Sequence, residues 1–321
     1  MAKKDERPWW DDRAKQMYSV IRDMEKVKKN ADIFASPKSI YNYFESQIYG
    51  CSEYKRAIST AIWSSINFKT KTNFLVVGPS GCGKTELARV FSKAYYNTII
   101  VDASTVSPVA YKGASTISQC LLEVDTSDLA LPPWIFIDEI DKAILKDNEL
   151  APMIMNELLK MIEGGQVYAG RDEKSARVID TSRINFVFLG TFSALKNEQS
   201  KSYGFLSGRD DNKANSSTIT REVLHKSTAL SNEFLGRING GILEVEPMNE
   251  DQVLNILSDP RYSPITRLEK LYRIHIDVSD EKLRELAGMS SRFGIRGIYS
   301  ELQNQINNAF FEDCTLESLT L

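Results

Sequence analysis

The chain has 321 residues, of which 42% are hydrophobic and 26% charged, so it is long enough for one large domain with a smaller attachment. Its 40 basic and 43 acidic side chains give a net charge of −3, which provides no overall basic field to attract nucleic acid. Four scattered cysteines and two histidines argue against a zinc site or a disulfide framework. Because the sequence also lacks a signal-peptide core and an apolar run of membrane-spanning length, we expect a cytoplasmic protein with no membrane partner.

The first 40 residues are polar and contain one amphipathic segment. Hydrophobic residues at helical spacing between positions 11 and 30 predict a helix, and Trp9 and Trp10 precede it. This arm either docks on a partner or packs on its own domain, and the sequence favours neither. A second helical stretch opens at Ser36-Pro37, and helical periodicity continues to about Trp63.

A glycine-rich loop follows the apolar run 74–77 and precedes a helix-like segment. The stretch Gly78-Pro79-Ser80-Gly81-Cys82-Gly83-Lys84-Thr85 matches the spacing G-x-x-x-x-G-K-[ST] in the strand–loop–helix context that this motif requires. Glycines let the backbone N–H groups turn inward around phosphate oxygens, and the helix N-terminus adds its positive dipole. We therefore expect a nucleoside triphosphate here, with Lys84 on the β/γ-phosphates and Thr85 on Mg²⁺.

Two carboxylates end a second apolar run, Trp134-Ile135-Phe136-Ile137. Ligands of open parallel sheets bind beyond the carboxyl ends of the strands, where the glycine-rich loop also lies. We expect Asp138 to orient Mg²⁺ and Glu139 to polarise the attacking water. The alternative is that both acids only cap the segment 140–146.

The remaining pattern alternates apolar strands with helices, which indicates an α/β fold with a parallel sheet covered on both faces. Expected strands are 73–77, 98–101, 134–137 and 184–189, with a helix over 151–162 and a hairpin or loop over 166–182. Thr191 follows the last of these strands, where its hydroxyl would contact the nucleophilic water or the γ-phosphate. Beyond Pro247 the pattern predicts a small, mostly helical domain with helices over 250–257, 265–272, 280–287 and 295–311 and a strand over 273–278.

With these motifs in order, the chain resembles the AAA+ ATPases, in the ClpX/HslU branch of Clp-type protein unfoldases. The resemblance covers roughly residues 45–315. Besides the two nucleotide motifs it is carried by Ile48-Tyr49-Gly50, by 157–164, by 180–184, by Asn232-Glu233-Phe234-Leu235-Gly236-Arg237 and by Gly294-Ile295-Arg296-Gly297.

The resemblance implies roles for several residues. Ile48 and Tyr49 would bind adenine, and Arg296 would contact phosphate within the same subunit. Arg237 would reach the γ-phosphate held by a neighbouring subunit, which implies a homo-oligomeric ring, six subunits in this family. Tyr111 and Lys112 align with the pore loop that grips a protein substrate. The expected reaction is hydrolysis of Mg²⁺-ATP, coupled to threading or remodelling of protein.

The chain also departs from the family pattern. We expect no zinc-binding N-terminal domain. Tyr203-Gly204-Phe205 lies where the family has a peptidase-docking loop, and the alternative to a peptidase partner is that this segment is an ordinary glycine turn. Cys82, beside a helix N-terminus, is expected to be a reactive thiol. Two alternatives stay open, a DNA-directed AAA+ motor or loader and a nucleotide-dependent scaffold. The expected division is an arm (1–40), a large domain (41–246) and a small domain (247–321).

Overall fold

A computed structural model describes residues 30–105, 116–127, 131–144, 148–170, 177–192, 221, 224–225, 228 and 230–321. Several sequence-based expectations lie outside these residues: the arm anchors Trp9 and Trp10, the pore-loop pair Tyr111 and Lys112, and the segment 203–205. Within the described residues, none of the helices combines the length and hydrophobicity needed to cross a membrane.

Five parallel strands form the central sheet in the order β2-β3-β6-β1-β7. Their bounds are β1 (Asn73–Val77), β2 (Thr98–Asp102), β3 (Trp134–Asp138), β6 (Asn185–Gly190) and β7 (Gly241–Glu244). Every residue of β1 and β6 is buried, which explains the apolar runs that follow Asn73 and Asn185 at their starts. The predicted α/β fold with a covered parallel sheet is confirmed, although the sequence analysis did not predict β7.

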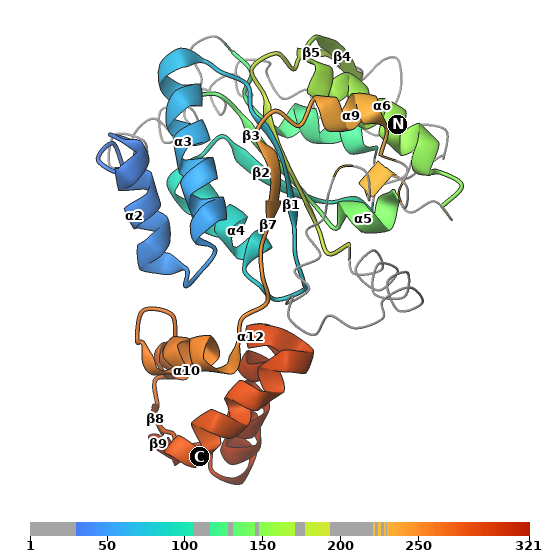
Figure 1. Ribbon diagram of the computed structural model, residues 1–321. Coiled ribbons are helices and arrows are strands. Elements are labelled where there is room, and N and C mark those ends of the chain that lie inside the picture. The colour runs from blue at the N-terminus through green and yellow to red at the C-terminus, as the bar shows by residue number, and fades with distance from the viewer. Residues whose placement is uncertain are drawn as a thin grey trace, which may run out of the picture.

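The two faces of the sheet carry separate hydrophobic cores because successive side chains of a strand point to opposite sides. One core joins alternate residues of β1, β3 and β6 to helices α2 (Pro37–Gln47), α3 (Ser52–Phe68) and α4 (Lys84–Ala94). The other core joins the intervening residues to η2 (Ile117–Glu123), α5 (Ile140–Ala143), α6 (Ala151–Glu163) and α9 (Asn232–Gly236). Figure 1 shows these helices on either side of the sheet.

Two short features complete the described part of this region. The 3-10 helix η1 (Ala103–Thr105) follows β2 directly. Strands β4 (Gln166–Ala169) and β5 (Arg177–Asp180) form an antiparallel pair in which Tyr168 faces Val178, so the hairpin expected over 166–182 is present.

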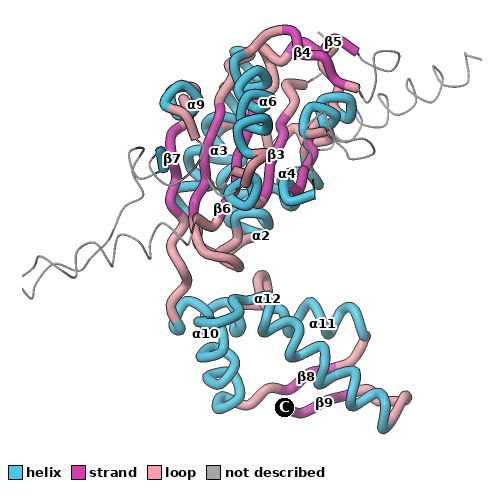
Figure 2. Tube along the Cα trace, turned by 90° about the vertical axis from the view of Figure 1, so that its right-hand side faces the viewer, coloured by secondary structure: helices cyan, strands magenta, loops and turns pink. Residues whose placement is uncertain are grey.

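The residues after Pro247 build a third hydrophobic core of their own. It is formed by α10 (Glu250–Ser258), α11 (Pro264–Tyr272), β8 (His275–Asp277), α12 (Asp280–Glu312) and β9 (Ser318–Thr320). In Figure 2 this C-terminal region lies below the sheet and is joined to it through the segment after β7. Two helices were predicted where α12 runs, and α12 is interrupted at Gly294, whose φ of 61° and ψ of −170° are not helical.

Candidate functional site

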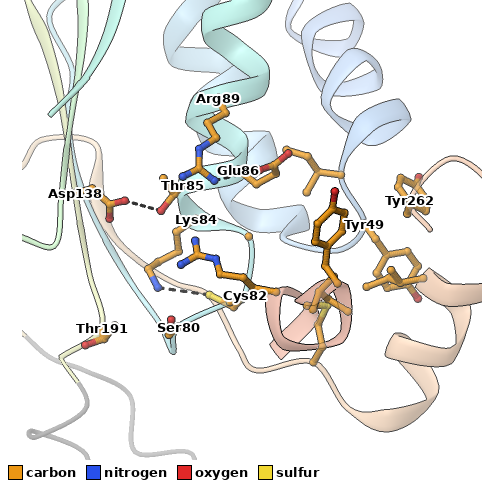
Figure 3. Close-up of a pocket in the computed structure, with 18 of the residues that line it drawn as sticks. Tyr49, Ser80, Cys82, Lys84, Thr85, Glu86, Arg89, Asp138, Thr191 and Tyr262 are labelled. Carbon is orange, nitrogen blue, oxygen red and sulfur yellow. Dashed lines mark hydrogen bonds and ion pairs between the residues drawn. The ribbon is translucent and has the colours of Figure 1, made fainter. Parts of the chain in front are cut away.

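A pocket of about 320 Å³ lies at the carboxyl ends of β1 and β3, between the sheet and the C-terminal region. Its sheet side is the segment Ser80–Glu86 together with Asp138, Glu139 and Thr191. Its opposite side comes from the C-terminal region and includes Tyr262 and Arg296. The glycine-rich segment Gly78–Thr85 is called the phosphate loop below. Figure 3 shows its residues Ser80, Cys82 and Lys84 in the middle of the pocket, with Asp138 and Thr191 to one side and Tyr49 and Tyr262 to the other. The site therefore has a charged end and an aromatic end.

The glycines of the loop are required by its geometry. Gly81 and Gly83 have φ angles of 80° and 94°, a backbone region that other residues rarely adopt. At Gly78 an added Cβ would lie 2.3 Å from the carbonyl oxygen of Val245, so no larger residue fits. The loop ends where α4 begins at Lys84, which leaves the free N–H groups of the helix N-terminus in the pocket wall.

Lys84 is buried beneath the loop, and its amine is engaged by the loop itself. Its Nζ donates to the carbonyl oxygens of Gly78 at 2.6 Å and Pro79 at 2.7 Å, and it lies 3.6 Å from Cys82 Sγ. These contacts hold the ammonium in the bend of the loop. An entering phosphate oxygen would replace carbonyl oxygens as the acceptor.

Thr85 and Asp138 form the charged end together. The Thr85 hydroxyl donates to Asp138 Oδ2 at 2.7 Å, while Asp138 Oδ1 accepts the backbone N–H of Glu139 at 2.9 Å. The two side chains come from the first turn of α4 and the end of β3, and the dashed line in Figure 3 marks their contact. Two oxygens side by side next to a phosphate-binding loop suit a hard cation such as Mg²⁺.

Glu139 has a left-handed backbone (φ 55°), which turns the chain sharply from β3 into α5. Its Oε2 lies 2.5 Å from Lys142 Nζ, and both side chains are exposed. The hydrogen bond to Glu139 raises the pKa of Lys142. The carboxylate that was predicted to polarise water is therefore bound to a lysine that also lines the pocket.

Thr191 lies in the pocket wall, but its hydroxyl donates to Asp141 Oδ2 at 2.7 Å. The same carboxylate oxygen accepts the backbone N–H of Phe192 at 3.1 Å. Because Asp141 uses the Thr191 proton, the predicted contact to water or phosphate would have to use a lone pair of the hydroxyl. That contact stays a prediction.

The aromatic end joins parts of the chain that are far apart in sequence. Tyr49 packs edge-on against Tyr262 with ring centroids 5.6 Å apart, and Asn255 Nδ2 donates to the Tyr49 hydroxyl at 3.4 Å. The Tyr262 hydroxyl in turn donates to the carbonyl oxygen of Glu45 at 2.5 Å. Ile48 lines the pocket beside Tyr49, so both residues predicted to bind a base lie at this end.

The two predicted arginines differ in position. Arg296 follows Gly294 and lines the pocket. Arg237 follows α9, lies outside the lining of this pocket, and binds Glu163 at 2.9 Å and Glu233 at 3.0 Å. In Figure 1, α9 lies toward the end of the sheet away from the C-terminal helices. Arg237 therefore does not reach the pocket of its own chain.

Cys82 is only 4% exposed, so the structure does not favour the reactive thiol expected from the sequence. Other lining residues were given no role in the sequence analysis. They include Glu86, whose carboxylate lies 3.5 Å from Arg89 and 3.9 Å from Arg267. The others are Gln47, Asp141, Lys142, Gly190, Met248, Ile256, Tyr262, Pro264, Ile295 and Tyr299.

Comparisons with known proteins identify the family of the chain. The sequence model of the AAA domain family (Cdc48 subfamily) matches residues 69–240, more than half of the chain. The ATP-dependent Clp protease ATP-binding subunit ClpX 2 of Wolinella succinogenes is 27% identical, with 95% of this chain and 85% of the relative covered. ClpX of Porphyromonas gingivalis is 26% identical over 86% of this chain and 77% of its own length. ClpX 3 of Methylococcus capsulatus is 27% identical, over 75% and 64% respectively. The chain therefore belongs to the AAA domain family and is a ClpX-like AAA+ ATPase.

Proposed function

We propose that this protein is an ATP-dependent unfoldase that assembles as a ring and threads or remodels protein substrates. The observation that carries the proposal is the convergence of Lys84, Thr85, Asp138 and Glu139 on one pocket at the carboxyl end of the sheet. The names of the similar ClpX proteins support protein as the substrate and do not favour a DNA-directed motor or a scaffold.

In this proposal the chain supplies positioning and charge stabilisation for transfer of the γ-phosphoryl group to water. Lys84 exchanges its loop carbonyls for β- and γ-phosphate oxygens, and the backbone of Pro79–Gly83 surrounds them. Thr85 and Asp138, already in contact at 2.7 Å, hold Mg²⁺. A bound Mg²⁺ neutralises negative charge on the phosphate oxygens.

Glu139 acts as the group that orients and polarises the attacking water. Because its carboxylate is bound to Lys142, this role requires the pair to open when nucleotide enters. The pair is exposed, so breaking it costs little free energy. Thr191 accepts a hydrogen bond from the same water, and Asp141 keeps the threonine oriented.

In this proposal Arg237 contacts the γ-phosphate bound by a neighbouring subunit, and Arg296 contacts phosphate in the pocket of its own chain. An arginine that stabilises transition-state charge across an interface makes each pocket depend on two subunits, which a closed ring satisfies. We propose six subunits, a large domain over 41–246 and a small domain over 247–321. The small domain would change its angle with nucleotide state because Arg296 and Tyr262 both line the pocket from that side.

Tyr111 and Lys112, outside the described residues, would form the pore loop that contacts the substrate. The 1–40 arm would dock on a partner or on its own domain. We also propose a cytoplasmic location and a peptidase partner.

The test measures ATP hydrolysis by the full chain with Mg²⁺, alone and with an unfolded protein or with DNA. We expect the unfolded protein, and not DNA, to stimulate hydrolysis. Glu139→Gln should bind ATP normally and retain protein substrate, while Tyr111→Ala should hydrolyse ATP without unfolding a folded test substrate. Stimulation by DNA alone, or normal unfolding by Tyr111→Ala, would overturn the threading proposal.

A further inference from the structure

The segment Ile48–Cys51 forms the wall of the aromatic end and has an unusual backbone. Gly50 and Cys51 are consecutive residues with left-handed backbones, with φ angles of 69° and 55°. A non-glycine residue in this region is strained and persists only where its surroundings fix it. The contacts that fix this segment therefore decide the shape of the aromatic end.

Lys55 supplies one of these contacts from outside the pocket. It lies in the first turns of α3, and its side chain is fully buried. Its Nζ donates to the carbonyl oxygen of Ile48 and, at 2.9 Å, to Glu45 Oε2. A buried ammonium is costly unless it is paired, so these two acceptors determine where it sits. Lys55 is not among the described residues that line the pocket.

Further bonds connect the segment to its surroundings. The N–H of Ile48 donates to the carbonyl oxygen of Phe44 at 2.9 Å, so the protein uses both backbone groups of Ile48. The Cys51 thiol donates to the carbonyl oxygen of Cys82 in the phosphate loop at 3.1 Å. Burial raises the pKa of Cys51 to about 11, which keeps this donor protonated at neutral pH. The segment is thus held between the phosphate loop on one side and Lys55 on the other.

The same contacts extend to the C-terminal region. Glu45, which binds the Lys55 amine, accepts the Tyr262 hydroxyl on its backbone carbonyl. Tyr262 packs against Tyr49, the residue after Ile48. A shift of the Ile48 carbonyl would therefore change the spacing of the two aromatic rings.

We propose that Lys55 is a positioning residue for the base of the nucleotide. By holding the Ile48 carbonyl, it fixes the shape of the aromatic end of the pocket and does not affect the charged end. The inference rests on the proposed nucleotide site. It assigns a part in nucleotide selection to a lysine that does not line the pocket.

The test separates the two ends of the ligand by measuring equilibrium binding of ATP and of inorganic tripolyphosphate, which has no base. In Lys55→Met the Kd for ATP should rise about tenfold, the equivalent of one charged hydrogen bond, while the Kd for tripolyphosphate changes less than about twofold. In steady-state hydrolysis the KM for ATP should rise while kcat stays near the wild-type value.

Lys71→Met is the matched control. Lys71 is partly buried, and its amine also donates to two backbone carbonyls, those of Met161 at 3.2 Å and Thr181 at 2.8 Å. It lies just before β1, whereas the phosphate loop follows β1, so its loss should leave the ratio of the two Kd values unchanged. Equal losses for ATP and tripolyphosphate in Lys55→Met, or the same change of ratio in Lys71→Met, would overturn the proposal.

Glu45→Gln covers the case in which Lys55→Met does not fold. The Glu45 side chain is 44% exposed, so its replacement leaves the fold intact while weakening its hold on Lys55. ATP binding should weaken by roughly threefold with tripolyphosphate unchanged, and an unchanged ratio would overturn the proposal. Failure of the proposed function would be seen in the wild-type protein. If it binds neither ATP nor tripolyphosphate, the pocket is not a nucleotide site. If it binds ATP but unfolded protein does not stimulate hydrolysis, only the proposed remodelling activity is removed.

Discussion

The charged and aromatic ends of the pocket are built in different ways. At the charged end, Lys84 and Thr85 open α4 and Asp138 ends β3, and these side chains contact each other or the phosphate loop directly. At the aromatic end, Tyr49 and Tyr262 come from positions more than 200 residues apart, one before α3 and one in the C-terminal region between α10 and α11. These three contacting side chains of the charged end thus come from the sheet region, whereas the aromatic pair exists only while the C-terminal region is in place. In the proposed motor, this difference indicates that hydrolysis takes place at the charged end and that movement of the C-terminal region changes the aromatic end.

Arg237→Ala tests whether the charged end is complete in one chain. Fingers supplied across an interface are worth on the order of 10³-fold or more in rate, so hydrolysis should fall by about that factor while ATP binding stays near normal. Lys282→Ala, which removes another ion-paired cation, the partner of Glu285 in the C-terminal region, should have little effect. Hydrolysis rates and ATP affinities measure both variants.

Mixing subunits decides in which pocket Arg237 acts. Glu139→Gln subunits still carry Arg237, and Arg237→Ala subunits still carry an intact pocket. Mixed rings should therefore regain hydrolysis that neither variant shows alone. Mixtures without such a gain would place Arg237 on its own pocket, or in a purely structural ion pair with Glu163.

Lys84→Met tests the charged end directly. Removing the ammonium takes away a charge-assisted contact to the phosphates, and kcat/KM should fall by about 10²-fold or more with ATP binding weakened. Lys93→Met, in the last turn of the same helix and exposed, is the control. A variant that binds and hydrolyses ATP normally would show that phosphate binds elsewhere.

Gly294→Ala tests how firmly the C-terminal region sits on the phosphate loop. The backbone of Gly294 (φ 61°, ψ −170°) is almost exclusive to glycine, and an added Cβ would lie 3.2 Å from Gly81 Cα. We expect a loss of about 1–3 kcal/mol in unfolding free energy and a KM for ATP a few-fold higher. Thermal unfolding and steady-state kinetics measure these effects.

Gly288→Ala is the opposite case on the same helix. An added Cβ there meets nothing closer than Glu250 Oε1 at 4.0 Å, so alanine should stabilise the helix by about 0.5–1 kcal/mol. If both glycine variants change stability equally and in the same direction, the contact between Gly294 and the loop has no special role.

The difference between the charged and the aromatic end also explains which features could be predicted from the sequence. Gly78–Thr85 and Asp138-Glu139 are contiguous motifs whose chemistry is local, and the structure brings them together as predicted. The strands with unbroken apolar runs were predicted for the same reason, since a strand buried on both faces shows it in its own residues.

The missed features depend on long-range contacts. The pairing of Tyr262 with Glu45 and of Arg237 with Glu163 joins distant segments that no local pattern connects. Strand β7 is only four residues long and begins at a glycine, and β9 is a three-residue strand whose pairing with β8 decides its conformation. Thr191 follows β6 and lines the pocket. Its hydrogen bond to Asp141 depends on the turn into α5 and could not be inferred from either residue alone.

The last prediction is a pH dependence at the wall of the aromatic end. Burial raises the folded-state pKa of Cys51 from 9.0 to about 11, so between these values the unfolded chain loses a proton that the folded chain keeps. The stability contributed by this thiol is therefore complete below pH 9 and is lost as the pH rises towards 11, with a total of about 3 kcal/mol for a shift of two pKa units. Cys51→Ser keeps a hydroxyl donor for the Cys82 carbonyl but does not ionise in this range. Denaturant unfolding at pH 8, 9 and 10 should show a steeper decline for wild-type protein than for the variant, and parallel slopes would mean that the thiol is solvated rather than held against the phosphate loop.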